Sequence, residues 1–174
     1  HLTRETKNGI SCTQIDYRIS RYKLTMRLSG HFSLNELTKS QTATRKGIDN
    51  TPSPEHIESL TDLCIQVLEP TRRHFGKPMV ITSGYRSADL CLAIGSNPNS
   101  QHAKGEAADF EMFGEDNKEL AKYIRSELIY DQLILEFYNS DDPSSGWVHC
   151  SYNKNNNRKQ SLIYDGKDYK PWLT

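Results

Sequence analysis

The chain has few cysteines and no long apolar run, and each of these features narrows the class of protein to which it can belong. No stretch reaches the roughly eighteen consecutive apolar residues of a membrane-spanning helix, and the first thirty residues lack a signal-peptide core. No pair of cysteines has C-x-x-C spacing, so we expect buried free thiols rather than a disulfide framework. With 174 residues, 35% of them hydrophobic and 25% charged, we expect one soluble globular domain. The cysteines are Cys12, Cys64, Cys91 and Cys150.

The formal net charge is zero, but the positively and negatively charged residues are unevenly distributed along the chain. Residues 1–47 contain nine Lys/Arg and three Asp/Glu, whereas the remainder contains thirteen and nineteen. This asymmetry predicts that the N-terminal part meets an anionic surface or an acidic partner. No nucleic-acid-binding motif accompanies the positive charge, so we do not expect nucleic acid as a partner.

The first thirty residues have a pattern typical of β-strands. Apolar residues alternate with polar ones from Ile15 to Ile19, and again from Tyr22 to Leu28 after a change of phase. Two interpretations remain open. The segment is either a hairpin that covers its own domain or an arm that adds to a partner's sheet.

The rest of the chain predicts helices followed by a cluster of strands. Ser33 to Glu36 is a capping box for a short helix ending near Ala43, and Ser53-Pro54 begins a long helix that Pro70 should bend or divide. This order favours an α+β fold with an antiparallel sheet flanked by helices. Strands are expected at 78–82, 106–113, 133–138 and 147–152, and further helices at 88–94 and 117–128.

One short segment, SQHAKGEAAD from Ser100 to Asp109, carries most of the chemical information. It holds His102 and Asp109, and His149 follows forty residues later. Two imidazoles and one carboxylate form a three-ligand set that leaves Zn²⁺ a fourth position for water, as in catalytic sites. Gly105 lets the backbone turn between the two ligands, and the alanines that follow it allow close packing.

The last predicted hairpin suggests a general base. If Tyr138 lies opposite Trp147 across the loop 139–146, then Glu136 lies opposite His149, and directly opposed residues share a face. A carboxylate beside a proposed zinc ligand is where a base must be to activate water. We therefore predict Glu136 as the catalytic base.

These motifs together resemble the zinc D-alanyl-D-alanine carboxypeptidase family, peptidase family M15, subfamily A. Its signature S-x-H-x-x-G-x-A-x-D matches Ser100 to Asp109. The resemblance covers about residues 31–153, which leaves 1–30 as a basic arm and 154–174 as a polar tail that packs on the domain. It is greatest to members from bacteriophage genomes, which are endolysins and virion lysins. Further matching pieces are HFSLNEL near His31, SGYRS at 83–87, DQLILEF at 131–137 and WVHCSY at 147–152.

The resemblance implies a zinc fold shared with hedgehog signalling domains, and a set of substrate contacts. It places Arg86 on the substrate carboxylate, although a structural salt bridge is the alternative for this residue. Tyr85 either lines the cleft or packs in the core. Ser100 and Gln101 are expected either to contact substrate or to support the metal ligands.

The resemblance also bears on the general base. Many members have the acid three residues before the last histidine ligand, where this chain has Gly146. Glu136 is therefore our choice, with Asp141 or Asp142 as weaker substitutes.

Two functions follow as expectations. The first is a zinc peptidase that cuts peptidoglycan stem peptides as a D,D-carboxypeptidase or an endopeptidase, acting on the cell wall from a phage virion or from the host cytoplasm before lysis. The second is a virion or tail component that keeps the zinc fold with little or no turnover, in which residues 1–30 contact phage structural proteins. Glu136 and Arg86 favour the enzyme, and the basic arm favours assembly.

Overall fold

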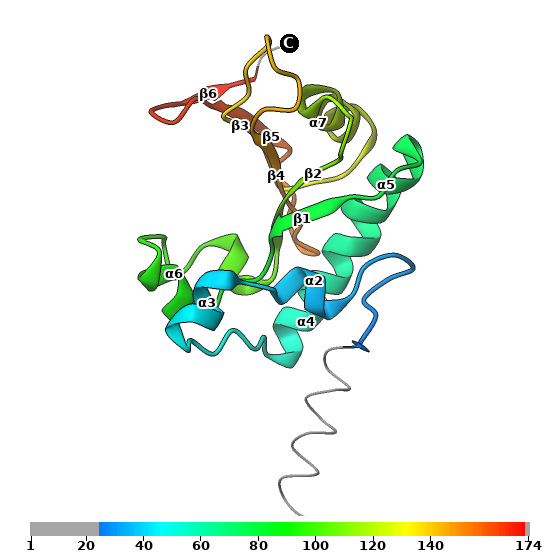
Figure 1. Ribbon diagram of the computed structural model, residues 1–174. Helices are drawn as coiled ribbons and strands as arrows, with labels where there is room; N and C mark the ends of the chain where they lie inside the picture. Colours follow the sequence, from blue (N-terminus) through cyan, green and yellow to red (C-terminus); the bar gives the residue numbers. More distant parts are fainter. Residues whose placement is uncertain (1–24, 173–174) are drawn as a thin grey trace, which may run out of the picture.

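The computed structural model describes residues 25–172, and they form a six-stranded sheet with its main helices on one face (Figure 1). The predicted alternation from Ile15 to Leu24 and the thiol of Cys12 lie outside the described residues. The strands are β1 (Val80–Ser83), β2 (Ala107–Glu111), β3 (Gln132–Glu136), β4 (Trp147–Ser151), β5 (Gln160–Tyr164) and β6 (Tyr169–Pro171). The α-helices are α2 (Leu34–Thr38), α3 (Gln41–Lys46), α4 (Pro54–Leu63), α5 (Glu69–Phe75), α6 (Ala88–Ala93) and α7 (Asn117–Glu127).

The sheet is mixed, with the strand order β1-β2-β4-β3-β5-β6. The α+β class is confirmed, but the sheet is not wholly antiparallel, because β5 runs parallel to β3. The other neighbouring strands pair antiparallel. The tail expected only to dock on the domain supplies β5 and β6, and Trp172 beyond them is 5% exposed in the core.

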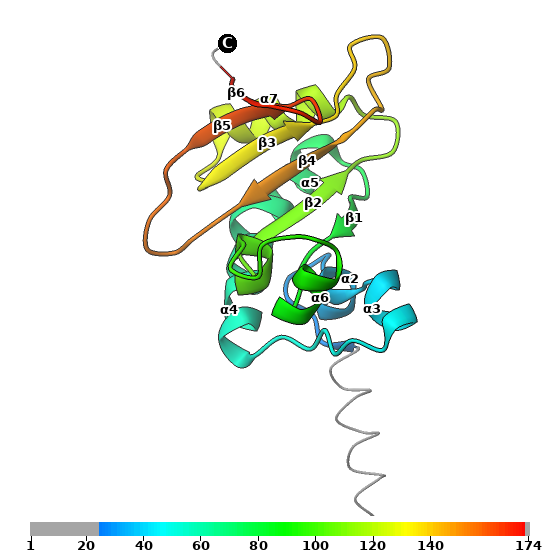
Figure 2. The ribbon, with the colours of Figure 1, turned by 90° about the vertical axis from the view of Figure 1, so that its left-hand side faces the viewer.

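The two faces of the sheet have different roles because successive side chains of a strand point to opposite sides. One face packs against α5 and α7, which lie behind the sheet in Figure 2. The opposite face of the central strands carries Asp109, Glu136 and His149. The core-facing residues of these strands are Ala108, Phe110, Leu133, Leu135, Val148 and Cys150.

The long helix predicted from Ser53 begins as expected and is divided before Pro70. The hydroxyl of Ser53 caps α4 by accepting from the His56 N–H. A π-helical turn, η1 (Cys64–Leu68), joins α4 to α5. Proline has no N–H and its ring crowds the preceding turn, so the wider π turn accommodates Pro70 without ending the helix.

The capping box is confirmed. Ser33 and Glu36 exchange the two expected hydrogen bonds at the start of α2. The helix expected to run to Ala43 is instead two, because Lys39 adopts an extended backbone and Ser40 caps α3.

The described residues before α2 belong to the packed domain. Leu28 is 6% exposed within the core, and the Met26 carbonyl accepts from the Leu34 N–H at 2.8 Å. The hydroxyl of Ser29 donates to Glu69 at 2.7 Å. The domain therefore includes residues from Met26 onward, of which the sequence assigned 26–30 to the arm.

The cysteines of the described chain are buried free thiols, as expected. They are Cys64, Cys91 and Cys150, and burial raises the pKa of the Cys64 and Cys150 thiols well above the usual range. Within residues 25–172, no helix is long and apolar enough to span a bilayer.

Candidate metal centre

The structure brings the three predicted ligands together. Asp109 on β2 lies directly opposite His149 on β4, and a 3₁₀ turn, η2 (Gln101–Lys104), supplies His102. Oδ1 of Asp109 is 2.8 Å from His149 Nδ1 and 3.3 Å from His102 Nε2. All three side chains are buried, with one ligand atom of each within 4.8 Å of the others. This arrangement fits a metal ion held by two imidazoles and a carboxylate.

The ring of His102 is oriented by the backbone. Its Nδ1 lies 2.7 Å from the Gly84 carbonyl oxygen, which can only accept, so Nδ1 carries the proton and Nε2 is left for a metal. Burial lowers the pKa of His102, and this outweighs the opposing effect of Asp109. The lowered pKa favours the neutral imidazole that a metal requires.

Two glycines make this orientation possible. A Cβ on Gly84 would lie 2.2 Å from the Leu37 carbonyl oxygen, so only glycine fits between α2 and His102. Gly105 ends η2 with a φ of +71°, and a Cβ there would lie 2.4 Å from the His56 oxygen. The turn expected at Gly105 is thus a left-handed residue beneath close backbone packing.

The Arg86 side chain forms a salt bridge with Asp109. Its terminal nitrogen donates to Asp109 Oδ2 at 2.8 Å, and its Nε donates to the Ser83 hydroxyl at 2.8 Å. This is the salt bridge that the sequence left as the alternative role, and it leaves Oδ1 as the ligand atom of Asp109. Contact of Arg86 with a substrate carboxylate stays a prediction.

The charge state of Asp109 suits a ligand. Burial by itself would raise the pKa of this carboxyl, but His102 and His149 outweigh burial and hold it far below its usual range. The Asp109 carboxyl is therefore ionised at neutral pH and can act as an anionic ligand.

The predicted register of the last hairpin is wrong by two residues. Glu136 pairs with Trp147, and Ile134 pairs with His149. The β3 strand ends at Glu136 because Phe137 turns away with a φ of +54°, so the loop begins earlier than assumed. A shift of two preserves the face, so Glu136 still shares the side of His149.

Glu136 lies in the cleft with the ligands. Burial raises its pKa, with Asp109 adding to the increase and His149 and Arg86 opposing it. The cleft has a volume of about 380 Å³, and its only carboxylates among the described residues are Asp109 and Glu136. The residues that line it are Arg86, Ser100, Gln101, His102, Asp109, Gln132, Ile134, Glu136, Trp147, His149 and Tyr169.

Gly146 explains why the acid is not three residues before His149. A Cβ at this position would lie 1.9 Å from the Glu136 carbonyl oxygen, and Gly146 has a φ of +68°. No carboxylate side chain fits there with this backbone. Asp141 and Asp142 are exposed in the loop and do not line the cleft, so the structure does not bring them to the ligands.

Of the remaining residues predicted to contact substrate, some line the cleft and one does not. Ser100 and Gln101 line the cleft beside His102. Tyr85 does not: it is 6% exposed in the core, its hydroxyl lies 3.3 Å from His56 Nδ1, and it reaches only a neighbouring pocket. Its role in substrate binding stays a prediction.

Sequence reasoning missed Tyr169. This residue of β6 lines the cleft and stacks on Tyr164 of β5, with ring centroids 4.4 Å apart. The apolar run Leu162-Ile163-Tyr164 could have indicated a strand, but the position of Tyr169 beside the cleft depends on tertiary pairing.

Comparison with known proteins agrees with the geometry. The family model described as Peptidase M15 matches residues 30–151, which contain all three ligands and Glu136. No curated protein matches the chain. Because the matched segment spans most of its length, the chain belongs to the peptidase M15 family.

Proposed function

We propose that the protein is a zinc metallopeptidase that hydrolyses peptide bonds in bacterial peptidoglycan stem peptides. The observation that carries this proposal is the buried His102, Asp109 and His149 cluster with Glu136 in the same cleft, in a chain of a peptidase family. Two imidazole nitrogens and one carboxylate oxygen form a donor set that favours zinc over harder cations.

The side chains have distinct tasks. A zinc ion held by the three ligands would supply Lewis-acid polarisation of the peptide carbonyl and activation of water. Glu136 accepts the proton of the attacking water and returns it to the leaving amine, and a raised pKa suits both halves of that exchange. Arg86 holds Asp109 so that one oxygen stays directed at the two histidines.

The choice of substrate rests on the motif resemblance. SGYRS, the Ser100–Asp109 segment and WVHCSY resemble D-alanyl-D-alanine carboxypeptidases and phage lysins. We therefore propose a phage lysin that acts on the cell wall as a carboxypeptidase or an endopeptidase. A contact of residues 1–30 with phage structural proteins is part of this proposal, supported by their positive charge.

Metal analysis and peptidoglycan digestion test the proposal together. The purified protein should bind one zinc per chain, and mass spectrometry of digested muropeptides should show a single type of cleaved bond. His149→Ala should lose most of the zinc and all cleavage. Full zinc occupancy in that variant would refute the ligand assignment, whereas a zinc-loaded protein without cleavage would favour a structural component of the virion.

A further inference from the structure

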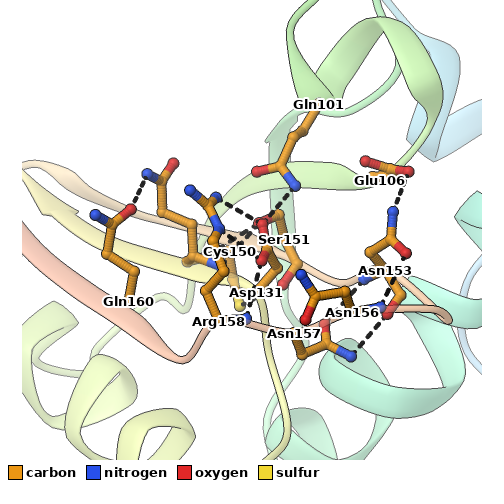
Figure 3. Close-up of polar contacts among 11 residues, drawn as sticks. Gln101, Glu106, Asp131, Cys150, Ser151, Asn153, Asn156, Asn157, Arg158 and Gln160 are labelled. Atoms are coloured by element: carbon orange, nitrogen blue, oxygen red, sulfur yellow. Dashed lines mark hydrogen bonds and ion pairs between the residues drawn. The ribbon is translucent and has the colours of Figure 1, made fainter.

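A buried carboxylate beyond the metal ligands holds one side chain of the cleft. Asp131 is 4% exposed, and it accepts a hydrogen bond from the Gln101 side chain, Nε2 to Oδ2, at 2.8 Å (Figure 3). Arg158 grips the same carboxylate with two parallel bonds, Nε to Oδ1 at 2.8 Å and its terminal nitrogen to Oδ2 at 2.7 Å. The Arg158 backbone N–H adds a fourth bond at 3.0 Å.

The backbone around this carboxylate is fixed on both sides. The Asp131 N–H donates to the Ser151 carbonyl on β4 at 2.8 Å, and the Asp131 carbonyl accepts from the Gln160 N–H on β5 at 3.0 Å. The hydrogen bonds from Arg158, with a smaller contribution from Gln101, outweigh the opposing effect of burial and lower the pKa of Asp131 to about 2. The carboxylate is therefore ionised and can only accept hydrogen bonds.

An acceptor-only partner settles which way the Gln101 amide points. Its NH₂ must face Asp131, so Oε1 is left with no hydrogen-bond partner among residues 25–172. Gln101 lines the cleft and directly precedes His102. A free, oriented carbonyl oxygen beside the ligands can recognise only a donor.

We infer that Gln101 Oε1 accepts a backbone N–H of the peptide substrate, and that Asp131 and Arg158 are positioning residues that fix this acceptor. The inference rests on the proposed function, because it names the group by which the same cleft holds its peptide. Arg158 lies beyond residue 151, where the family match ends, so the residue that holds Asp131 comes from outside the matched segment.

The geometry predicts how the contact should register in kinetics. One neutral hydrogen bond changes affinity by roughly three- to tenfold. Without its hydrogen bond to Asp131, the Gln101 amide is free to turn its NH₂ into the cleft, which replaces an acceptor by a donor. Loss of the hydrogen bond between Gln101 and Asp131 should therefore raise KM more than it lowers kcat.

The test uses stem peptides in which one non-scissile amide at a time is replaced by an ester, which removes the N–H without adding bulk. In the wild type, one ester should lower kcat/KM by roughly three- to tenfold. In Gln101→Ala that same ester should cost nothing further. A Gln101→Ala protein that still discriminates as the wild type does would overturn the inference.

Asp131→Asn tests the positioning role, and Glu69→Gln is the matched control. Glu69 is a carboxylate 8% exposed that accepts from Ser29 and His31 outside the cleft. Both variants should lose stability, but only Asp131→Asn should raise KM and lose the discrimination between amide and ester. Arg158→Lys, which keeps the charge without the two-point grip, should lie between Asp131→Asn and wild type. Identical kinetics of Asp131→Asn and the control would refute the role of Asp131.

Calorimetric binding of the same peptides separates this inference from the proposed function. A wild type that binds the peptides with the predicted discrimination but cleaves none would refute the peptidase and support the acceptor. Cleavage without any ester effect would do the reverse. A wild type that neither binds nor cleaves would overturn both.

Discussion

Arg86 donates to Oδ2 of Asp109 at 2.8 Å, on the side of the carboxylate away from the two histidines. One residue of the SGYRS motif therefore orients a proposed metal ligand. This relationship changes what a substitution at Arg86 is expected to do, because the metal and the substrate are both affected.

Arg86→Lys should weaken zinc binding by roughly ten- to a hundredfold, as loss of a hydrogen bond to a ligand does elsewhere. Zinc titration checks this. Comparing stem peptides that end in a carboxylate or an amide then isolates any substrate contact. Equal losses of kcat/KM for both peptides would limit Arg86 to holding Asp109, whereas a larger loss for the carboxylate would support the substrate role.

Glu136→Gln should keep the fold and the zinc but lower kcat by about 10²–10⁴-fold, because a positioned base contributes that much. Zinc content and melting temperature serve as controls for the kinetic measurement. Undiminished turnover would show that Glu136 is not the base. An acid introduced as Gly146→Asp should not restore activity to Glu136→Gln, because no Cβ fits at position 146.

Gly84→Ala should lower both thermal stability and zinc affinity, because its Cβ would collide with the Leu37 carbonyl and displace the oxygen that orients His102. Gly30→Ala is the matched control, since a Cβ there meets the Glu69 carboxylate at an ordinary 3.5 Å. Calorimetric melting with and without zinc measures the two effects. A Gly84→Ala protein as stable as Gly30→Ala would contradict this account.

The ion pair of Asp131 and Arg158 should make stability depend on acid. The folded pKa of Asp131 is about 2, below its ordinary value, so the pair stabilises the fold fully above pH about 4 and less as the pH falls toward 2. The free energy of unfolding of Asp131→Asn, from urea titration, should be roughly 1–3 kcal/mol below wild type at pH 6. That difference should shrink toward pH 2, and a constant difference across this range would argue against the pair.

Deleting residues 1–24 should leave a folded, zinc-binding domain, whereas deleting residues 1–28 should destabilise it. The assignment of residues 1–30 to an arm implies that the longer deletion is tolerated, but Leu28 is buried in the core, and losing such a side chain costs about 2–5 kcal/mol. Melting curves of the two truncated proteins decide. Equal stability would show that Leu28 contributes little, and a wall-binding assay on the shorter deletion then tests the basic arm.

The sequence was sufficient for features that depend on local spacing. The capping box at Ser33 and the N-cap at Ser53 follow from hydrogen bonds within one turn, and the faces of β2 and β4 follow from alternation along each strand. The seven-residue spacing of His102 and Asp109 predicted that the two side chains meet, and they do, because a glycine between them permits the turn that joins η2 to β2.

Tertiary structure decided everything that depends on how distant segments meet. The register of β3 on β4 was set by a left-handed Phe137, which no periodicity reveals, although the period of two kept Glu136 on the correct face. The tail entered the sheet as β5 because β3 had an unpaired edge, and this brought Tyr169 to the cleft and Arg158 to Asp131. Those contacts join residues up to dozens of positions apart, so only the folded chain, in which backbone pairing fixes their separation, determines them.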